Sequence, residues 1–99
     1  MCGITGYIGV KDGLNITLKC LHGLEYRGYD SAGAVFFESG QLRLIKAVGK
    51  LINLDKKLEG VRAACNMVAI AHTRWATHGA PNEINAHPHH DCSKKIFLL

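Results

Sequence analysis

Two leucine-patterned segments alternate with short apolar runs in this chain, and this order restricts its fold more than any single motif does. Short apolar runs with β character predict strands, at residues 3–10, 34–37, 42–45, 66–71 and 96–99. Leucines three or four residues apart predict amphipathic helices, over residues 14–25 and 50–59. Residues 38–41 predict a hairpin turn, and residues 28–33 and 79–93 predict loops. The pattern is typical of a small α+β domain.

The composition bounds the class of protein. With 99 residues, 47% of them hydrophobic and 20% charged, the chain fits one small globular domain. No apolar run approaches the roughly 20 residues that span a bilayer, and no basic segment precedes an apolar one, so we expect a cytoplasmic protein with reduced cysteines. The net charge of +4 comes from scattered lysines, which favours a solvated surface over a nucleic-acid interface. The apolar run at 96–99 indicates a fragment, because a natural domain seldom stops in mid-strand.

Cys2 follows the initiator methionine and precedes Gly3. Its small side chain predicts removal of Met1, which would leave a thiol and a free α-amine on one residue. The α-amine has an ordinary pKa of about 7.7–8.0 and can accept the thiol proton near neutral pH. Nucleophile and general base then come from a single residue. We therefore take Cys2 as a candidate nucleophile, with a small residue of no catalytic role as the alternative.

Arg74 follows an apolar run, where a side chain can project from the rim of a sheet into a pocket. Its planar guanidinium matches a carboxylate with two hydrogen bonds. Thr77 and His78 add short donors beside it. The alternatives are a surface salt bridge for Arg74 and a helix cap for Thr77. Trp75 is either a core residue or an aromatic lid over a small ligand.

Arg27 lies in a tyrosine-rich stretch and directly precedes Gly28. It either contacts a substrate or is buried, binding loop carbonyls and fixing the turn. Asp30 and Ser31 can cap a local turn.

Four potential metal ligands lie within six residues, at His87, His89, His90 and Cys92. Such a set can hold zinc. Pro88 and the short spacing disfavour a geometry in which this loop alone supplies all the ligands of one tetrahedral site. A solvated or partner-contacting loop is therefore the main expectation, and we predict no metal site.

Four motifs together resemble the glutaminase domain of the class II, or N-terminal-nucleophile, glutamine amidotransferases. Within that class the chain is most similar to the glutamine–fructose-6-phosphate aminotransferases, from its first residue to its last. The motifs are Cys2-Gly3-Ile4, Tyr26-Arg27-Gly28-Tyr29-Asp30-Ser31-Ala32-Gly33, Ala71-His72-Thr73-Arg74-Trp75-Ala76-Thr77-His78-Gly79 and Asn85-Ala86-His87-Pro88-His89.

The resemblance implies a role for each candidate residue in glutamine hydrolysis. Cys2 would attack the side-chain amide of glutamine, forming a γ-glutamyl thioester and releasing ammonia, with its own α-amine as the base. Arg74 would bind the α-carboxylate of glutamine, with Thr77 and His78 completing that end of the pocket. Trp75 would lie in the loop that closes over glutamine.

The resemblance also assigns residues around this pocket. Arg27 and Gly28 would shape the wall behind the nucleophile. Tyr29 and His87 would face the acceptor, on the sugar-isomerase side.

The fold implied is the four-layer αββα sandwich of the N-terminal-nucleophile hydrolases, of which residues 1–99 supply an incomplete N-terminal portion. In this family the strand matching residues 96–99 leads into an Asn-Gly oxyanion-hole segment, which this sequence does not contain. We expect a partial glutaminase domain without sugar-isomerase domains, and no synthase activity from these residues alone.

The resemblance implies glutamine and fructose 6-phosphate as substrates, the latter bound by the absent domains. It implies no cofactor, no nucleic-acid or membrane partner, and a homodimer. Two alternatives stay open: an amidotransferase with another acceptor, such as phosphoribosylpyrophosphate, and a non-catalytic glutamine-binding module. A retained Met1 would favour the second, because a blocked Cys2 has no free amine.

Overall fold

The computed structural model describes residues 1–61 and 68–99. Its helical elements are α1 (Gly13–His22), the 3-10 turn η1 (Glu25–Arg27) and α2 (Leu51–Leu58). Its strands are β1 (Gly3–Ile8), β2 (Ser31–Glu38), β3 (Gln41–Val48), β4 (Val68–Arg74), β5 (His89–His90) and β6 (Phe97–Leu98). The predicted α+β class and both predicted helices are confirmed, and the first part of the strand predicted over 66–71 lies outside the described residues.

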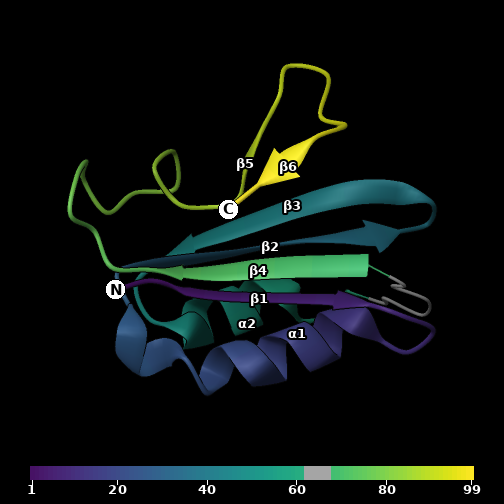
Figure 1. Ribbon diagram of the computed structural model, residues 1–99, viewed down its shortest axis with the longest axis horizontal. Coiled ribbons are helices and arrows are strands. Elements are labelled where there is room, and N and C mark those ends of the chain that lie inside the picture. Colours follow the sequence, from purple (N-terminus) through teal and green to yellow (C-terminus); the bar gives the residue numbers. More distant parts are fainter. Residues whose placement is uncertain (62–67) are drawn as a thin grey trace.

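The main sheet has the order β1-β4-β2-β3, and every neighbouring pair is antiparallel. The last long strand, β4, is inserted between the first two, so residues 3–8 lie beside residues 68–74 although they are far apart in the sequence (Figure 1). Gly3 pairs with Thr73, and the register continued by one residue places Cys2 beside Arg74. The topology therefore brings the first and third motifs together.

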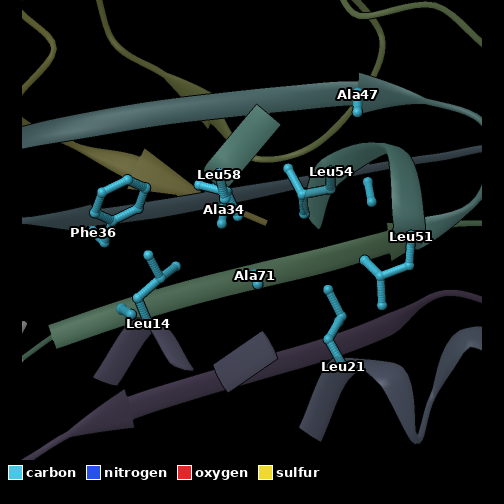
Figure 2. Packing of buried hydrophobic residues seen from close by; sticks show 11 residues of the cluster. Leu14, Leu21, Ala34, Phe36, Ala47, Leu51, Leu54, Leu58 and Ala71 are labelled. Carbon is cyan, nitrogen blue, oxygen red and sulfur yellow. The ribbon is translucent and has the colours of Figure 1, made fainter. Parts of the chain in front are cut away.

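Both helices cover the same face of the sheet, as Figure 1 shows. Helix α1 packs on β1 and β4, whereas α2 packs mainly on β3. The core is formed by large side chains from the helices against small ones from the strands: Leu14, Leu21, Leu51, Leu54 and Leu58 meet Ala32, Ala34, Ala47, Ala69, Ala71 and Phe36 (Figure 2). The alanines let the helices approach the sheet closely, so the leucines fill the space with few voids.

The strands differ from the sequence prediction at their ends. Residues 31–33 were predicted as loop, but they form the start of β2, which pairs with both β3 and β4. The third motif was predicted to follow a strand, yet His72, Thr73 and Arg74 are its last residues. A short strand, β5, also lies in the predicted 79–93 loop and pairs with β6. Residues 31–33 and 72–74 can enter strands because the neighbouring strands supply backbone partners.

The other face of the main sheet carries no helix. Side chains alternate along a strand, so Cys2 and Ile4 of the first strand share this face with His72 and Arg74 of β4. Several apolar side chains here are exposed, including Ile4, Ile8, Val68, Phe37 and Leu42. The segment that carries β5 and β6 lies on this side of the sheet (Figure 1).

None of the helices in residues 1–61 and 68–99 is long and apolar enough to cross a membrane.

Candidate active site

Cys2 lies just before β1, at the end of the sheet where β4 finishes. Its Sγ atom is 3.4 Å from the backbone nitrogen of Trp75, which donates to it, and 3.9 Å from the carbonyl oxygen of that residue. These two contacts hold the Cys2 side chain against the backbone of Trp75. Cys2 also lines a shallow hollow of about 290 Å3 together with Gly3, Ile4, Leu24 and Arg27.

Arg27 holds the first residues of the chain in place. Its Nε atom donates to the carbonyl oxygen of Cys2 at 3.2 Å, and its Nη2 atom lies 3.7 Å from the sulfur of Met1. Of the two roles considered from the sequence, the structure shows carbonyl binding, but the carbonyl belongs to the candidate nucleophile rather than to the arginine's own loop. Arg27 is half-buried, so this contact fixes the orientation of the N-terminal residues.

Arg74 is 7% exposed, at the end of β4. Its Nη1 atom donates to the carbonyl oxygen of Ala80 at 3.2 Å, and its Nη2 atom donates to the carbonyl oxygens of His78 and Gly79. The alternative of a surface salt bridge is therefore wrong, because the guanidinium is buried against backbone oxygens. A guanidinium has about five N–H donors, so these contacts leave part of it free to bind a carboxylate.

Trp75 is 46% exposed, so the core alternative for this residue is wrong. Its ring meets that of Tyr29 edge to face, with the centroids 5.7 Å apart. Together with Asp30 and Ala76 these rings line a pocket of about 230 Å3. Trp75 links this pocket to the candidate nucleophile, because its side chain lines the pocket and its backbone nitrogen contacts the Cys2 sulfur.

Asp30 joins the second and third motifs, a contact that the sequence analysis missed. Its Oδ2 atom accepts a hydrogen bond from the backbone nitrogen of Ala76, and its Oδ1 atom accepts one from Ser31 Oγ at 2.9 Å. Its backbone nitrogen donates to the carbonyl oxygen of Arg74 at 3.2 Å. Asp30 thus fixes the backbone on both sides of Trp75, whereas the sequence analysis assigned it only a local turn.

Gly28 is required by a close approach of two chain segments. A Cβ atom at this position would lie 2.6 Å from the carbonyl carbon of Arg74 and 2.8 Å from the nitrogen of Trp75. Real Cβ atoms do not come so close to backbone atoms, so a side chain here would displace the N–H that faces Cys2.

The remaining predicted residues lie farther from the thiol. Thr77 and His78 are exposed in the loop after β4, and the helix-cap alternative for Thr77 is wrong because no helix is described after α2 in residues 68–99. The carbonyl of His78 binds Arg74. His87 packs against His72 on the sheet face without helices, with the ring centroids 4.4 Å apart.

The segment that carries His87, His89, His90 and Cys92 was considered as a metal site from the sequence. Among residues 1–61 and 68–99, no group of three or more histidine, cysteine, aspartate or glutamate side chains is placed to hold a metal ion. His90 faces Phe97, and Cys92 is exposed.

Comparison with known proteins shows which sequences and structures this chain is similar to. No family model matches the sequence. The chain is 52% identical over all its 99 residues to glutamine–fructose-6-phosphate aminotransferase from Gloeobacter violaceus, of which it covers 16%. It is 51% identical over the same length to the enzyme of that name from Synechocystis sp., again covering 16%. It is 56% identical over 89 residues, 90% of the chain, to the one from Campylobacter jejuni, covering 15%.

A solved structure shows the same fold. The glutamine phosphoribosylpyrophosphate amidotransferase from B. subtilis matches 89% of this chain and 18% of its own, with a TM-score of 0.71 and 26% identity. The predicted fold class is confirmed by this match, with the described residues forming part of the fold. The chain spans about a sixth of the length of the curated relatives it matches. This chain therefore resembles, over its whole length, the N-terminal part of the glutamine–fructose-6-phosphate aminotransferases, with the fold of the N-terminal-nucleophile glutamine amidotransferases.

Proposed function

We propose that this chain is the glutaminase part of an amidotransferase that hydrolyses glutamine and transfers the ammonia to fructose 6-phosphate, giving glucosamine 6-phosphate and glutamate. The observation that carries the proposal is the position of the Cys2 thiol, 3.4 Å from the backbone nitrogen of Trp75 and beside the strand end that carries Arg74. A nucleophile, an N–H donor and a carboxylate-binding side chain thus meet at one end of the sheet.

The reaction begins once Met1 has been removed, because only then does Cys2 carry a free α-amine. The amine takes the thiol proton while sulfur attacks the amide carbon of the glutamine side chain. The amine returns the proton to the departing nitrogen, so the C–N bond breaks, ammonia leaves and a thioester forms. Water then cleaves the thioester, which releases glutamate and restores the thiol. Arg27, bound to the carbonyl of Cys2, keeps the amine and thiol oriented during these steps.

Arg74 supplies the recognition of glutamine in this proposal. Its N–H groups that are not bound to the 78–80 loop would pair with the α-carboxylate, and Thr77 and His78 would complete that end of the pocket. Trp75, which is about half exposed, would close over the bound substrate. Gly28 has no side chain, so its backbone can lie directly against that of Arg74 and Trp75. This assignment predicts that Arg74 acts on substrate binding and Cys2 on chemistry.

Fructose 6-phosphate is the acceptor we propose, because the relatives near 50% identity carry that substrate in their names. Tyr29 would face the acceptor side, since it lies beside Trp75 on the outer wall of the pocket. The same role was implied for His87, but its packing against His72 favours a positioning role. We also propose a homodimer in the cytoplasm, where the free thiols of Cys2, Cys20 and Cys92 would stay reduced.

Intact-mass analysis after treatment with the glutamine-analogue electrophile 6-diazo-5-oxonorleucine tests the glutaminase assignment. We expect one adduct on an N-terminal Cys2, with Met1 absent and protection by glutamine. Cys20 and Cys92 are internal controls, because both are exposed thiols away from the motif residues and should stay unlabelled. The variant Cys2→Ser should show no adduct. A retained Met1, or labelling at the other thiols, would favour the non-catalytic binding module.

The acceptor is tested separately with the intact protein and labelled glutamine. Amide nitrogen should appear in glucosamine 6-phosphate when fructose 6-phosphate is supplied. Transfer to phosphoribosylpyrophosphate instead would leave the glutaminase assignment standing and refute the acceptor.

A further inference from the structure

Three histidine rings pack against one another on the sheet face that carries no helix. The ring centroids of His72 and His87 are 4.4 Å apart, and those of His87 and His89 are 4.5 Å apart. His72 belongs to β4, whereas the other two follow the long loop after it. We call these three residues the histidine clasp, because they join a loop to the sheet.

The clasp is packed as a neutral unit. His72 is 3% exposed, and the Nδ1 atoms of His72 and His87 are both buried with no hydrogen-bond partner in the described residues. A charged imidazolium needs a partner for each N–H, so a second proton on either ring would bury an unpaired donor. Two charged rings at this distance would also repel each other.

The backbone around His87 lies directly on the sheet. A Cβ atom at Gly33 of β2 would be 2.2 Å from the carbonyl oxygen of His87, and Ala86 and Pro88 are buried. The loop therefore contacts β2 through its backbone and β4 through the ring of His87. Loss of the ring contact would remove one of these attachments, while Glu83 of the same loop stays paired with Lys57 of α2.

The same loop holds the guanidinium of Arg74. The carbonyl oxygen of Ala80 accepts hydrogen bonds from Arg74 Nη1 and from Asn85 Nδ2, at 3.2 and 3.0 Å. The backbone nitrogen of Ala86 donates to the carbonyl oxygen of Asn82 at 3.1 Å. Residues 78–86 thus form a compact loop with Arg74 at one end and the clasp at the other.

The charged groups that face the clasp are mostly cationic. His72 faces Arg74 and the other two rings, with Asp30 as the opposing anion. His87 and His89 face Lys46 of β3 as well as Arg74, and His89 also faces His90. Burial and the neighbouring imidazole lower the pKa of His72 to about 4, and burial lowers the pKa values of His87 and His89 as well. The surroundings therefore favour neutral rings.

We propose that the histidine clasp positions the 78–86 loop, and through it Arg74, and that protonation of the clasp at acid pH releases the loop. His72, His87 and His89 are then positioning residues that act through Arg74, and their effect on glutamine binding rests on the proposed glutaminase function. The loop's release itself does not depend on that function.

Hydrogen–deuterium exchange of the intact protein, followed by mass spectrometry between pH 7.5 and 5.0, tests the release. After correction for the intrinsic exchange rate, protection of the 78–86 loop should fall as pH falls, by about tenfold per pH unit for each proton taken up on opening. Protection of the β2–β3 hairpin should fall much less than that of the loop. The variant His87→Phe keeps a ring against His72 but removes one of the three groups that can take up a proton, so protection of its loop should fall less steeply than in the wild type.

The matched control is His90→Phe, because His90 is exposed and lies outside the clasp. Protection of its 78–86 loop should depend on pH as it does in the wild type. If His87→Phe does not fold, His89→Gln tests the same point by removing the outer ring, and should weaken the pH dependence. Equal pH dependence in wild type and His87→Phe, or in wild type and His89→Gln, would overturn the proposal, as would protection that does not change with pH in the wild type.

Glutamine hydrolysis by the same proteins separates the two proposals. In the wild type we expect the KM for glutamine to rise toward pH 5.5, whereas in His87→Phe it should rise less while kcat keeps its own pH profile. A wild type without glutamine turnover at pH 7.5 would refute the proposed function, and the exchange experiment would still decide on the clasp.

Discussion

Gly28 shows how tightly single residues fix the candidate site. Its α-carbon lies against the peptide bond that joins Arg74 to Trp75, and this bond carries the N–H that faces the Cys2 sulfur. The backbone of Gly28 itself is extended, so the requirement for glycine comes from contact and not from its dihedral angles.

We expect Gly28→Ala to reduce labelling of Cys2 by the glutamine analogue and to destabilise the protein by about 1–3 kcal/mol, the usual cost of overpacking. The added methyl group would push the nitrogen of Trp75 away from the sulfur. Rates of adduct formation and urea unfolding measure the two effects. Gly6→Ala is the matched control, since a Cβ there would make only ordinary contacts at 3.7 Å and beyond. Wild-type labelling in Gly28→Ala would contradict this account.

Arg74→Lys keeps the positive charge and removes the planar set of donors. A lysine cannot bind the three carbonyls of residues 78–80 together, so buried oxygens lose partners at a cost of about 1–3 kcal/mol. We expect a lower unfolding midpoint and a higher KM for glutamine with a smaller change in kcat. The control is Arg43→Lys, at an exposed ion pair with Glu38, which should leave the unfolding midpoint and the KM for glutamine unchanged. An unaltered KM would remove Arg74 from the glutamine pocket.

At this scale the sequence predicted residue types better than contacts. Cys2 and Arg74 could be predicted as candidates because a thiol is nucleophilic and a guanidinium binds carboxylates whatever the fold. The contact between Asp30 and Ala76 was missed because nothing in the local sequence relates positions 46 residues apart. The burial of Arg74 was missed for the same reason.

Among the elements, α2 begins in an unusual way. Its N-cap residue, Lys50, makes no side-chain capping bond, and the backbone nitrogen of Leu51 donates instead to Glu25 Oε2 at 2.8 Å. The acceptor therefore comes from η1, which is distant in sequence, and the negative charge also interacts favourably with the start of the helix. The turn η1 and α2 are thus joined through this bond.

We expect Glu25→Ala to destabilise the protein by about 1 kcal/mol, as the loss of a helix cap usually does. Unfolding in urea measures the change, and Glu59→Ala at the exposed end of the same helix is the control. An identical midpoint for wild type and Glu25→Ala would show that water replaces the carboxylate without cost.

Element types followed from the sequence, whereas several boundaries did not. Leucine spacing predicted both helices, and the turn of the β2–β3 hairpin fell where expected, with Ser39 and Gly40 in left-handed conformations. Residues 31–33 and 72–74 became strand because neighbouring strands supply hydrogen bonds to them. Their polar composition gave no indication of this.

For the molecule as a whole, stability should depend on pH through His72. Burial and the nearby His87 lower the pKa of His72 from 6.5 to about 4, so the unfolded chain binds a proton more readily than the native one. The resulting stability is fully present above about pH 6.5 and is lost as the pH falls toward about 4.

Urea midpoints measured between pH 7.5 and 4.5 should therefore fall with pH in the wild type. His72→Phe has no ring that titrates, so its midpoint should fall less steeply over the same range. Equal slopes for the two proteins would show that His72 is not the group responsible.

The sequence by itself determined the two helices, the order of the long strands and the candidate nucleophile, because spacing, side-chain polarity and chemical reactivity are local properties. The tertiary structure decided which residues form the site. Insertion of β4 between β1 and β2 places Cys2 beside Arg74 and Trp75, and it stacks His72 against a histidine from a later loop. Such contacts depend on strand pairing between distant segments, whose register is set by packing and hydrogen bonding across the whole sheet.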